Sequence, residues 1–186
     1  MGKAQERTRR QILTAFLDLL MNKPYDMISI SAVAEASFVT RSTFYRYFPD
    51  KKSLLKAEIE ETVDKTIPDQ PLMVQFVRYV EVYWPVLRHL APTRQSRADV
   101  HEILNNILWE LIYQRVQEST IDDPVIDKIR SSKYPTIMNS AVAGMLMGIL
   151  ERYVAEGTEK VNKRQLETTV NELVKMFKIK TIKPAK

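Results

Sequence analysis

Apolar residues recur at helical spacing near the start of the chain, and this pattern predicts a helix over about residues 4–21. Asn22 and Pro24 follow the last apolar position and are typical of a helix end. The side chains expected on the buried face of this helix are Ile12, Leu13, Phe16, Leu17 and Leu20.

Two shorter helices are predicted next along the chain. Ser29 or Ser31 caps the first of them, because a serine hydroxyl can accept a hydrogen bond from a free amide at a helix start. After a turn, a further helix is expected over about residues 40–47, and Pro49 ends it. Asp50 is expected to cap a fourth helix.

The rest of the chain keeps a helical period, and no stretch alternates convincingly in the way a strand requires. Pro85 lies inside one of these patterns and predicts a kink or a break there. The fold class predicted is all-α, with an N-terminal domain in residues 1–49 and a larger helical domain in residues 50–186, joined by the helix from about 50 to 66. The later helices are expected at about 72–90, 98–118, 124–132, 135–156 and 162–178.

Positive charge is concentrated in the first third of the chain. Residues 1–56 hold ten Lys or Arg and five Asp or Glu, which equals the net charge of +5 of the whole protein. The remaining residues therefore carry no net charge. A basic N-terminal module on a neutral body is typical of a protein that binds nucleic acid through one end, although scattered surface charge gives the same balance.

Composition excludes several other classes of protein. With no cysteine, the chain cannot hold a disulfide scaffold, a zinc finger or a thiol nucleophile. It has only four glycines, no Gly-rich phosphate loop, no HExxH motif and no evident pair of catalytic carboxylates, so we expect neither an enzyme nor a cofactor. His89 and His101, with Asp99 and Glu102 nearby, are the one conceivable metal site, and we predict that no metal binds.

The chain also lacks the sequence signals of export and membrane insertion. Its first residues are polar, so no signal-peptide core is present. The longest apolar run, residues 141–150, has about half the length that a membrane helix needs. We therefore expect a cytoplasmic protein with no membrane partner.

The stretch from Ser29 to Leu55 has the residue types of a DNA-recognition element. A short capped helix, a tight turn and a second short helix with hydroxyls, Arg and Tyr are what a helix-turn-helix needs to place side chains in the major groove. About residues 9–57 resemble the N-terminal domain of TetR-family regulators. The matching positions are Ser29, Val33-Ala34, Val39-Thr40, Thr43-Phe44-Tyr45, Phe48, Lys51 and Leu54-Leu55.

The resemblance implies a role for individual side chains. Arg41 and Ser42, at the start of the recognition helix, are the main candidates for reading bases, and Arg46 is a further one. Phe44 and Phe48 are expected to point inward, onto Ile12 and Phe16. Arg7, Arg9 and Arg10 either reach the DNA as a basic arm or form a solvated helix start. The residues expected to lie at phosphates are Ser29, Thr40, Thr43, Tyr45, Tyr47 and Lys51.

One position departs from the family pattern. TetR-family regulators usually have glycine in the turn before the recognition helix, and this chain has Phe38. Either the turn is built differently here, or Phe38 keeps the left-handed conformation and gains compensating burial against the first helix.

The larger domain of this family binds an effector and dimerises through its last two helices. The segment from Ala141 to Leu150 is apolar on nearly every face, so it must be covered either by a two-fold partner or inside a monomer. The residues predicted at the dimer interface are Ala141, Gly144, Gly148, Leu166, Val170, Leu173 and Phe177. The residues predicted to line an effector pocket, with plain core as the alternative, are Phe76, Tyr79, Tyr83, Trp84, Ile107, Trp109 and Met145.

The resemblance thus predicts a homodimeric repressor on a near-palindromic operator in duplex DNA, released by an effector in the C-terminal domain. That effector is either a small molecule or a protein coactivator or corepressor. A nucleoid or division-site protein on the same helix-turn-helix scaffold is the remaining alternative.

Overall fold

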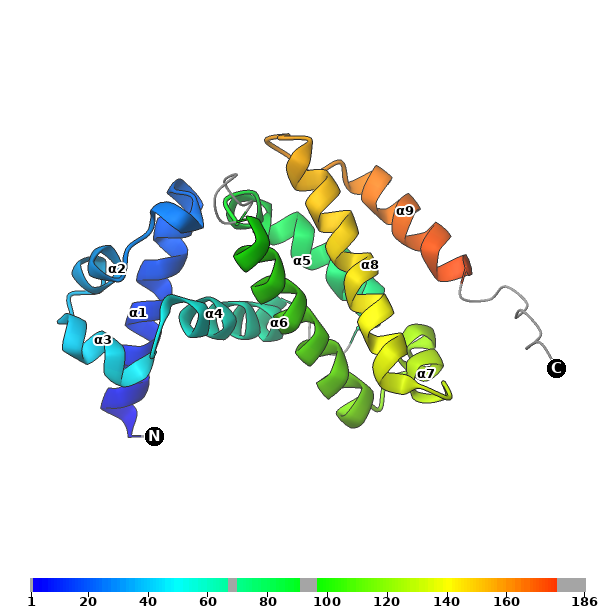
Figure 1. The fold of residues 1–186 in the computed structure, drawn as a ribbon, viewed down its shortest axis with the longest axis horizontal. Coiled ribbons are helices and arrows are strands. Elements are labelled where there is room, and N and C mark those ends of the chain that lie inside the picture. Colours follow the sequence, from blue (N-terminus) through cyan, green and yellow to red (C-terminus); the bar gives the residue numbers. More distant parts are fainter. Residues whose placement is uncertain (1, 67–69, 91–96, 177–186) are drawn as a thin grey trace.

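The structure, a computed structural model, describes residues 2–66, 70–90 and 97–176, and every regular element in these ranges is a helix. An all-α fold is therefore confirmed. Figure 1 shows the first three helices gathered at one end of the molecule and the later helices at the other, with α4 running between them.

The N-terminal end is built from α1 (Lys3–Asn22), α2 (Ile30–Ala36) and α3 (Arg41–Tyr47). A single turn of 3₁₀-helix, η1 (Tyr25–Met27), which the sequence pattern did not predict, leads from α1 into α2. Phe44 and Phe48 lie in the same buried cluster as Ile12 and Phe16, so the predicted inward orientation of the two phenylalanines is confirmed. Burial of these rings holds the two short helices, which are too short to be stable alone.

The other end is a bundle of longer helices. It comprises α4 (Lys51–Thr66), α5 (Leu72–Leu87), α6 (Arg97–Glu118), α7 (Pro124–Arg130), α8 (Pro135–Ala155) and α9 (Lys163–Met176). Their ends lie within a few residues of the predicted ones because the apolar period, the prolines and the caps all mark the same limits. Asp50 caps α4 as expected, since its Oδ1 accepts a hydrogen bond from the Ser53 amide at 2.7 Å.

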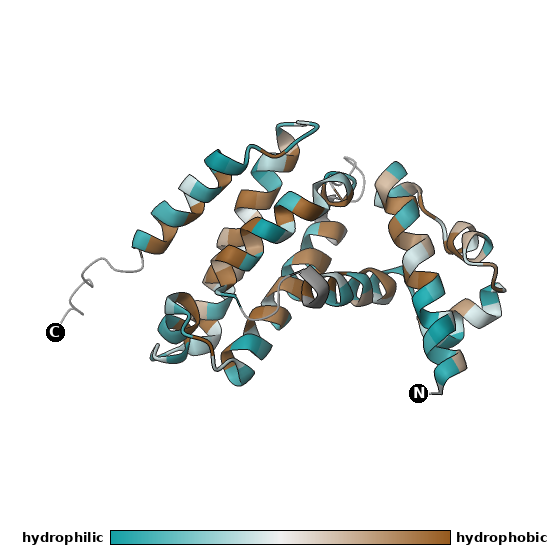
Figure 2. Cartoon of the chain, turned by 180° about the vertical axis from the view of Figure 1, so that it is seen from behind, coloured by the Kyte–Doolittle hydropathy of each residue, from teal (hydrophilic) through white to brown (hydrophobic). Residues whose placement is uncertain are grey.

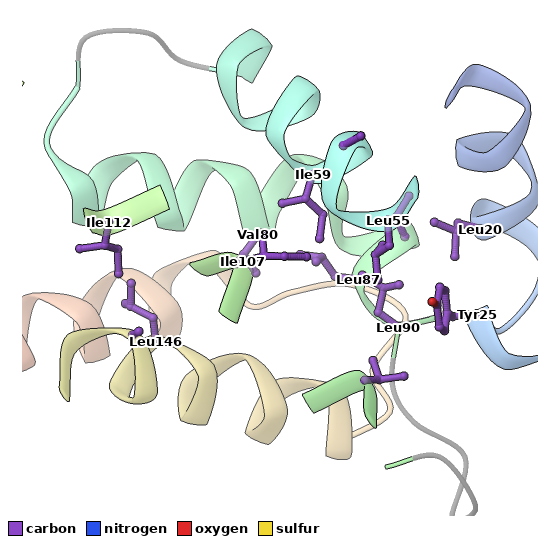
Figure 3. Close-up of a cluster of buried hydrophobic side chains, with 14 of the residues drawn as sticks. Leu20, Tyr25, Leu55, Ile59, Val80, Leu87, Leu90, Ile107, Ile112 and Leu146 are labelled. Atoms are coloured by element: carbon purple, nitrogen blue, oxygen red, sulfur yellow. The ribbon is translucent and has the colours of Figure 1, made fainter. Parts of the chain in front are cut away.

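One hydrophobic core runs through both ends of the molecule. Figure 3 shows it passing from Leu20 and Tyr25, across Leu55 of α4, to Ile107 and Leu146 in the bundle. The apolar faces of the helices turn inward, and polar positions gather along the N-terminal half of α1 (Figure 2). Helix α4 therefore shares buried surface with both ends, and a displacement of α4 changes the packing of side chains at both ends.

The predicted kink or break at Pro85 is wrong in its stronger form, because α5 continues through Pro85 to Leu87. A proline in the last turn of a helix removes one amide hydrogen bond where the helix is about to end anyway.

In the described ranges, no helix combines the length and the apolar character needed to cross a membrane.

Candidate DNA-binding surface and effector cavity

Two hydroxyl caps define the helix-turn-helix. The Ser29 hydroxyl accepts a hydrogen bond from the Ala32 amide at 3.1 Å, and the Thr40 hydroxyl accepts one from the Thr43 amide at 3.1 Å. The capped amides no longer need other partners, so α2 and α3 begin at fixed residues. Thr40 is thus the cap of α3, and its oxygen also lies 2.9 Å from the Ser42 hydroxyl.

Helix α3 presents polar side chains to solvent on the side opposite Phe44, which is fully buried. Arg41, Ser42 and Arg46 are exposed, and Tyr45 is 45% exposed. Of the other predicted contacts, Ser29 and Thr40 are exposed, while Thr43 and Tyr47 are half-buried. Helix α3, which carries the candidate base-reading residues, lies at the end of the molecule remote from α9 (Figure 1).

The turn before α3 resolves the two alternatives for Phe38. Its φ is +53°, so the left-handed conformation is kept despite the side chain. The expectation that Phe38 gains compensating burial against the first helix is wrong, because the ring is 90% exposed. A non-glycine residue in this conformation costs about 1 kcal/mol, and nothing in the folded chain offsets that cost through burial of the ring.

Lys51 is held inside the N-terminal domain. Its ammonium donates hydrogen bonds to the carbonyls of Tyr25 at 2.9 Å and Ile28 at 3.0 Å, and it lies 4.1 Å from the centre of the Tyr25 ring. Partial burial lowers the pKa of Lys51, and the charge of Asp26 acts in the opposite direction. Lys51 thus fastens the start of α4 to η1, and at most one ammonium proton remains for the predicted phosphate contact.

We expect Lys51→Ala to lower the free energy of unfolding by about 1.5–3 kcal/mol, because two carbonyls lose hydrogen bonds from a charged donor. Thermal unfolding of the variant measures this. Lys52→Ala is the matched control, since Lys52 is the exposed neighbour on the same turn. Equal stability of the two variants, with a weaker salt dependence of DNA binding for Lys51→Ala alone, would instead favour a phosphate contact without a structural role.

The basic residues at the start of the chain lie within α1 and do not form an extended arm. Arg9 forms an ion pair with Glu61 of α4 at 3.1 Å, and its guanidinium lies 5.9 Å from the centre of the Phe48 ring. Arg10 lies 4.0 Å from Glu6 and stays exposed, as does Arg7. Arg9 therefore helps to join α1 to α4, and Arg7 and Arg10 face solvent.

The C-terminal bundle holds a cavity of about 250 Å³, partly open to solvent, between α4, α5, α6 and α8. Its wall is mostly aliphatic, and Ile59 and Val63 of α4 form part of it. Three of the predicted pocket residues line this cavity: Phe76, Tyr79 and Ile107. The other four, Tyr83, Trp84, Trp109 and Met145, are not among its lining residues.

The tryptophans have other surroundings. Trp84 is buried, packs edge-on against Tyr153, and donates a hydrogen bond from Nε1 to the Thr158 carbonyl at 3.0 Å. Trp109 donates to the Ser140 hydroxyl at 3.0 Å and stacks on Tyr113. Helical spacing predicted aromatic residues on one side of each helix, but not how each helix is rotated about its axis.

Few polar groups reach the cavity. The Tyr79 hydroxyl is 3.0 Å from the Thr62 hydroxyl, and burial raises the pKa of Tyr79 above its usual range, so the phenol is neutral. Arg115 is the one charged lining residue in the described ranges; its Nη1 donates to Gln75 at 2.6 Å and its Nε lies 3.7 Å from Asp123. The sequence pattern did not single out Arg115 or Asp123, because only the fold brings them together.

The two histidines do not come together. Nδ1 of His89 is 2.7 Å from the Leu20 carbonyl, whereas Nδ1 of His101 is 2.5 Å from Glu151. In the part of the chain that the structure describes, no three His, Cys, Asp or Glu side chains gather in a way that could hold a metal ion.

Three of the residues predicted at the dimer interface are exposed, and all three lie on α8. Ala141, Gly144 and Gly148 are exposed on it, and a methyl group added to either glycine would meet no atom within 4 Å. Leu166 and Val170 were predicted at the interface too, but they are buried where α9 packs on α5 of the same protomer. For these two residues the prediction is wrong. Leu173 is half-buried, and Phe177 lies outside the described residues.

Two short, hydroxyl-capped helices, the second with exposed Arg, Ser and Tyr side chains, define a helix-turn-helix DNA-binding protein. Residues 12–57 match the family model described as "Bacterial regulatory proteins, tetR family". This match assigns the N-terminal helix-turn-helix region, residues 12–57, to that family.

Curated relatives share mainly this N-terminal region. The transcriptional activator of the dhaKLM operon, DhaS, from Lactococcus lactis is 25% identical over 127 residues, which cover 68% of this chain and 65% of DhaS. The transcriptional repressor KstR from Rhodococcus jostii is 37% identical over 64 residues, which cover 34% of this chain and 30% of KstR. The chain thus spans less than two thirds of the length of either relative.

The likeness in fold extends further than the likeness in sequence. A TetR transcriptional regulator from Rhodococcus sp. RHA1 has a similar structure, with a TM-score of 0.57 at 14% identity. The similarity covers 97% of this chain and 100% of that one, so the C-terminal bundle shares the fold as well.

Proposed function

We propose that the protein is a homodimeric transcriptional regulator that represses its target genes by binding a near-palindromic operator. The observation that carries this proposal is the exposed row of Arg41, Ser42 and Arg46 on a capped helix that is packed firmly through Phe44. Two such helices related by a two-fold axis fit major grooves about 34–36 Å apart. In this proposal the protein acts by binding and not by catalysis, and it works in the cytoplasm.

Arg41 is proposed to read a base, since the most common specific contact of arginine is to the edge of guanine. Arg41→Ala is therefore expected to lose about 1–3 kcal/mol of discrimination at one base pair in each half-site, with the other positions unchanged. Sequencing the DNA selected from a random duplex library by each protein measures this. Arg46→Ala is the matched comparison, and a loss of preference in that variant alone would move the base contact to Arg46.

The effector is proposed to be an uncharged, mainly apolar small molecule. The cavity wall is aliphatic and aromatic, the Tyr79 phenol is neutral, and the charge of Arg115 lies beside Asp123. An ionic ligand would lose its hydration there without gaining a free counter-charge. Tyr79 and Gln114 also line the cavity and can orient one polar atom of the ligand.

Release of DNA is proposed to pass through α4. Ile59 and Val63 of α4 face the cavity, while Lys51 at its other end donates hydrogen bonds to the carbonyls of Tyr25 and Ile28. A ligand that moves Ile59 and Val63 therefore moves the helix-turn-helix relative to the bundle. A coupling of about 1–3 kcal/mol is enough to change operator affinity 5–150-fold.

Leu111→Trp is expected to abolish release by apolar compounds while leaving operator affinity unchanged, because the larger side chain fills part of the cavity. Fluorescence anisotropy of labelled operator DNA, titrated with a panel of neutral long-chain alcohols and sterols, measures both quantities. Tyr113→Trp is the control, since Tyr113 lies on the same helix but does not line the cavity. Equal release of operator DNA from both variants would show that the effector does not bind in this cavity.

Activation is the second candidate function, because DhaS is named as an activator. A reporter gene placed behind the selected operator distinguishes the two: a repressor lowers its expression, and an activator raises it.

A further inference from the structure

The Phe38 ring is exposed on a strained turn. A positive φ disfavours any side chain, and 90% exposure of a phenylalanine ring leaves its apolar surface in water. Both features are unfavourable to the isolated protein, and glycine would remove both. Strained residues of this kind cluster at binding sites, so Phe38 is a candidate contact residue.

The turn holds the Phe38 ring in a defined place. The Phe38 amide donates to the Glu35 carbonyl at 3.0 Å, and the next amide, of Val39, donates to Ala34 at 2.9 Å. The side-chain amide of Gln11 in α1 donates to the Ser37 carbonyl at 2.7 Å. With the backbone fixed on both sides, the ring is presented to a partner at little further loss of conformational entropy.

The surroundings of Phe38 indicate which partner. Phe38 precedes the Thr40 cap by two residues, so its Cα lies within about 7 Å of the start of α3, the end that enters the major groove. The ring also borders a surface hollow lined by Lys3, Arg7 and Arg10, with Glu6 and Asp18 in the same lining. An apolar ring between a basic hollow and a recognition helix fits the border of a DNA groove, where phosphates flank the bases.

We propose that Phe38 contacts the 5-methyl group of a thymine at the edge of the major-groove site. This methyl group is the one apolar feature that a base pair presents in the major groove, and an aromatic ring is a suitable partner for it. The proposal rests on the proposed function, since it takes α3 as the recognition helix. It adds a specificity residue at a position where a glycine could make no such contact.

The test uses the full-length protein and the operator that it selects from a random duplex library. Phe38→Gly unfolds at the same temperature as the wild type or a higher one, because the turn is no longer strained. The same variant binds the operator about 5–30-fold more weakly, since the apolar contact is lost. Phe38→Leu keeps an apolar side chain and most of the affinity.

Replacing operator thymines one at a time by uracil removes only the methyl group. One position per half-site weakens binding by the wild type and by Phe38→Leu about fourfold, and leaves Phe38→Gly unaffected. Wild-type affinity in Phe38→Gly, or a uracil effect that persists in that variant, overturns the role of Phe38. Failure of the wild type to select any duplex would overturn the proposed function itself, so the two failures are distinguishable.

Discussion

Asp123→Ala is expected to lower the free energy of unfolding by about 3–5 kcal/mol, the largest stability effect of any single substitution considered in this chain. The carboxylate is 1% exposed and serves three elements at once. Its Oδ1 accepts hydrogen bonds from the amides of Val125 and Ile126 at the start of α7, and its Oδ2 accepts one from the Leu72 amide at the start of α5, at 2.6 Å.

Arg115 increases the loss of stability that we expect for Asp123→Ala. Its Nε lies 3.7 Å from Asp123 and, apart from this ion pair, is a buried nitrogen without a hydrogen-bond partner. Removing the carboxylate leaves the Arg115 Nε and three backbone amides without a partner in the interior. Thermal or urea unfolding measures the effect, with the exposed neighbour Asp122→Ala as the matched control. Similar stability of the two variants would show that Asp123 does not join α5, α6 and α7.

Gly148→Arg is expected to weaken operator binding by at least about 100-fold while leaving the fold of the protomer intact. A Cβ at this position meets nothing within 4 Å, so the protomer has room for the side chain. The proposed partner, in contrast, approaches α8 along the small residues Ala141, Gly144 and Gly148, where a long cationic side chain blocks it. A monomer then binds one half-site without the gain from the second.

Analytical ultracentrifugation of Gly148→Arg should show a monomer at micromolar concentration, where the wild type is a dimer. Gln117→Arg, at an exposed and neutral residue of α6, is the control for the added positive charge. If the variant remains dimeric and binds the operator normally, this face of α8 is not the dimer interface.

Local pattern was enough to predict the helices and the recognition surface. The residues that form α3 and its cap lie within eight consecutive positions, so their relative arrangement follows from helical geometry alone. The burial of Phe44 and Phe48 follows for the same reason. Which side chains α3 exposes and which it buries was therefore readable from the sequence.

The features that the sequence did not predict all depend on distant segments. Lys51 was expected at a phosphate, but η1, itself unpredicted, brings two carbonyls to it from more than twenty residues earlier. The amphipathic pattern of α9 showed that Leu166 and Val170 would be buried, but not whether α5 or a second protomer would cover them. The cavity depends on the rotation of four helices about their axes, which periodicity leaves open.

Selection of DNA from a random duplex library by the wild-type protein, followed by sequencing, tests the central claim most directly. The account predicts one enriched motif with two inverted half-sites whose centres lie one helical turn apart, about 34–36 Å, and protection of both by the dimer. Enrichment of no sequence, or of a single half-site bound by a monomer, would contradict it.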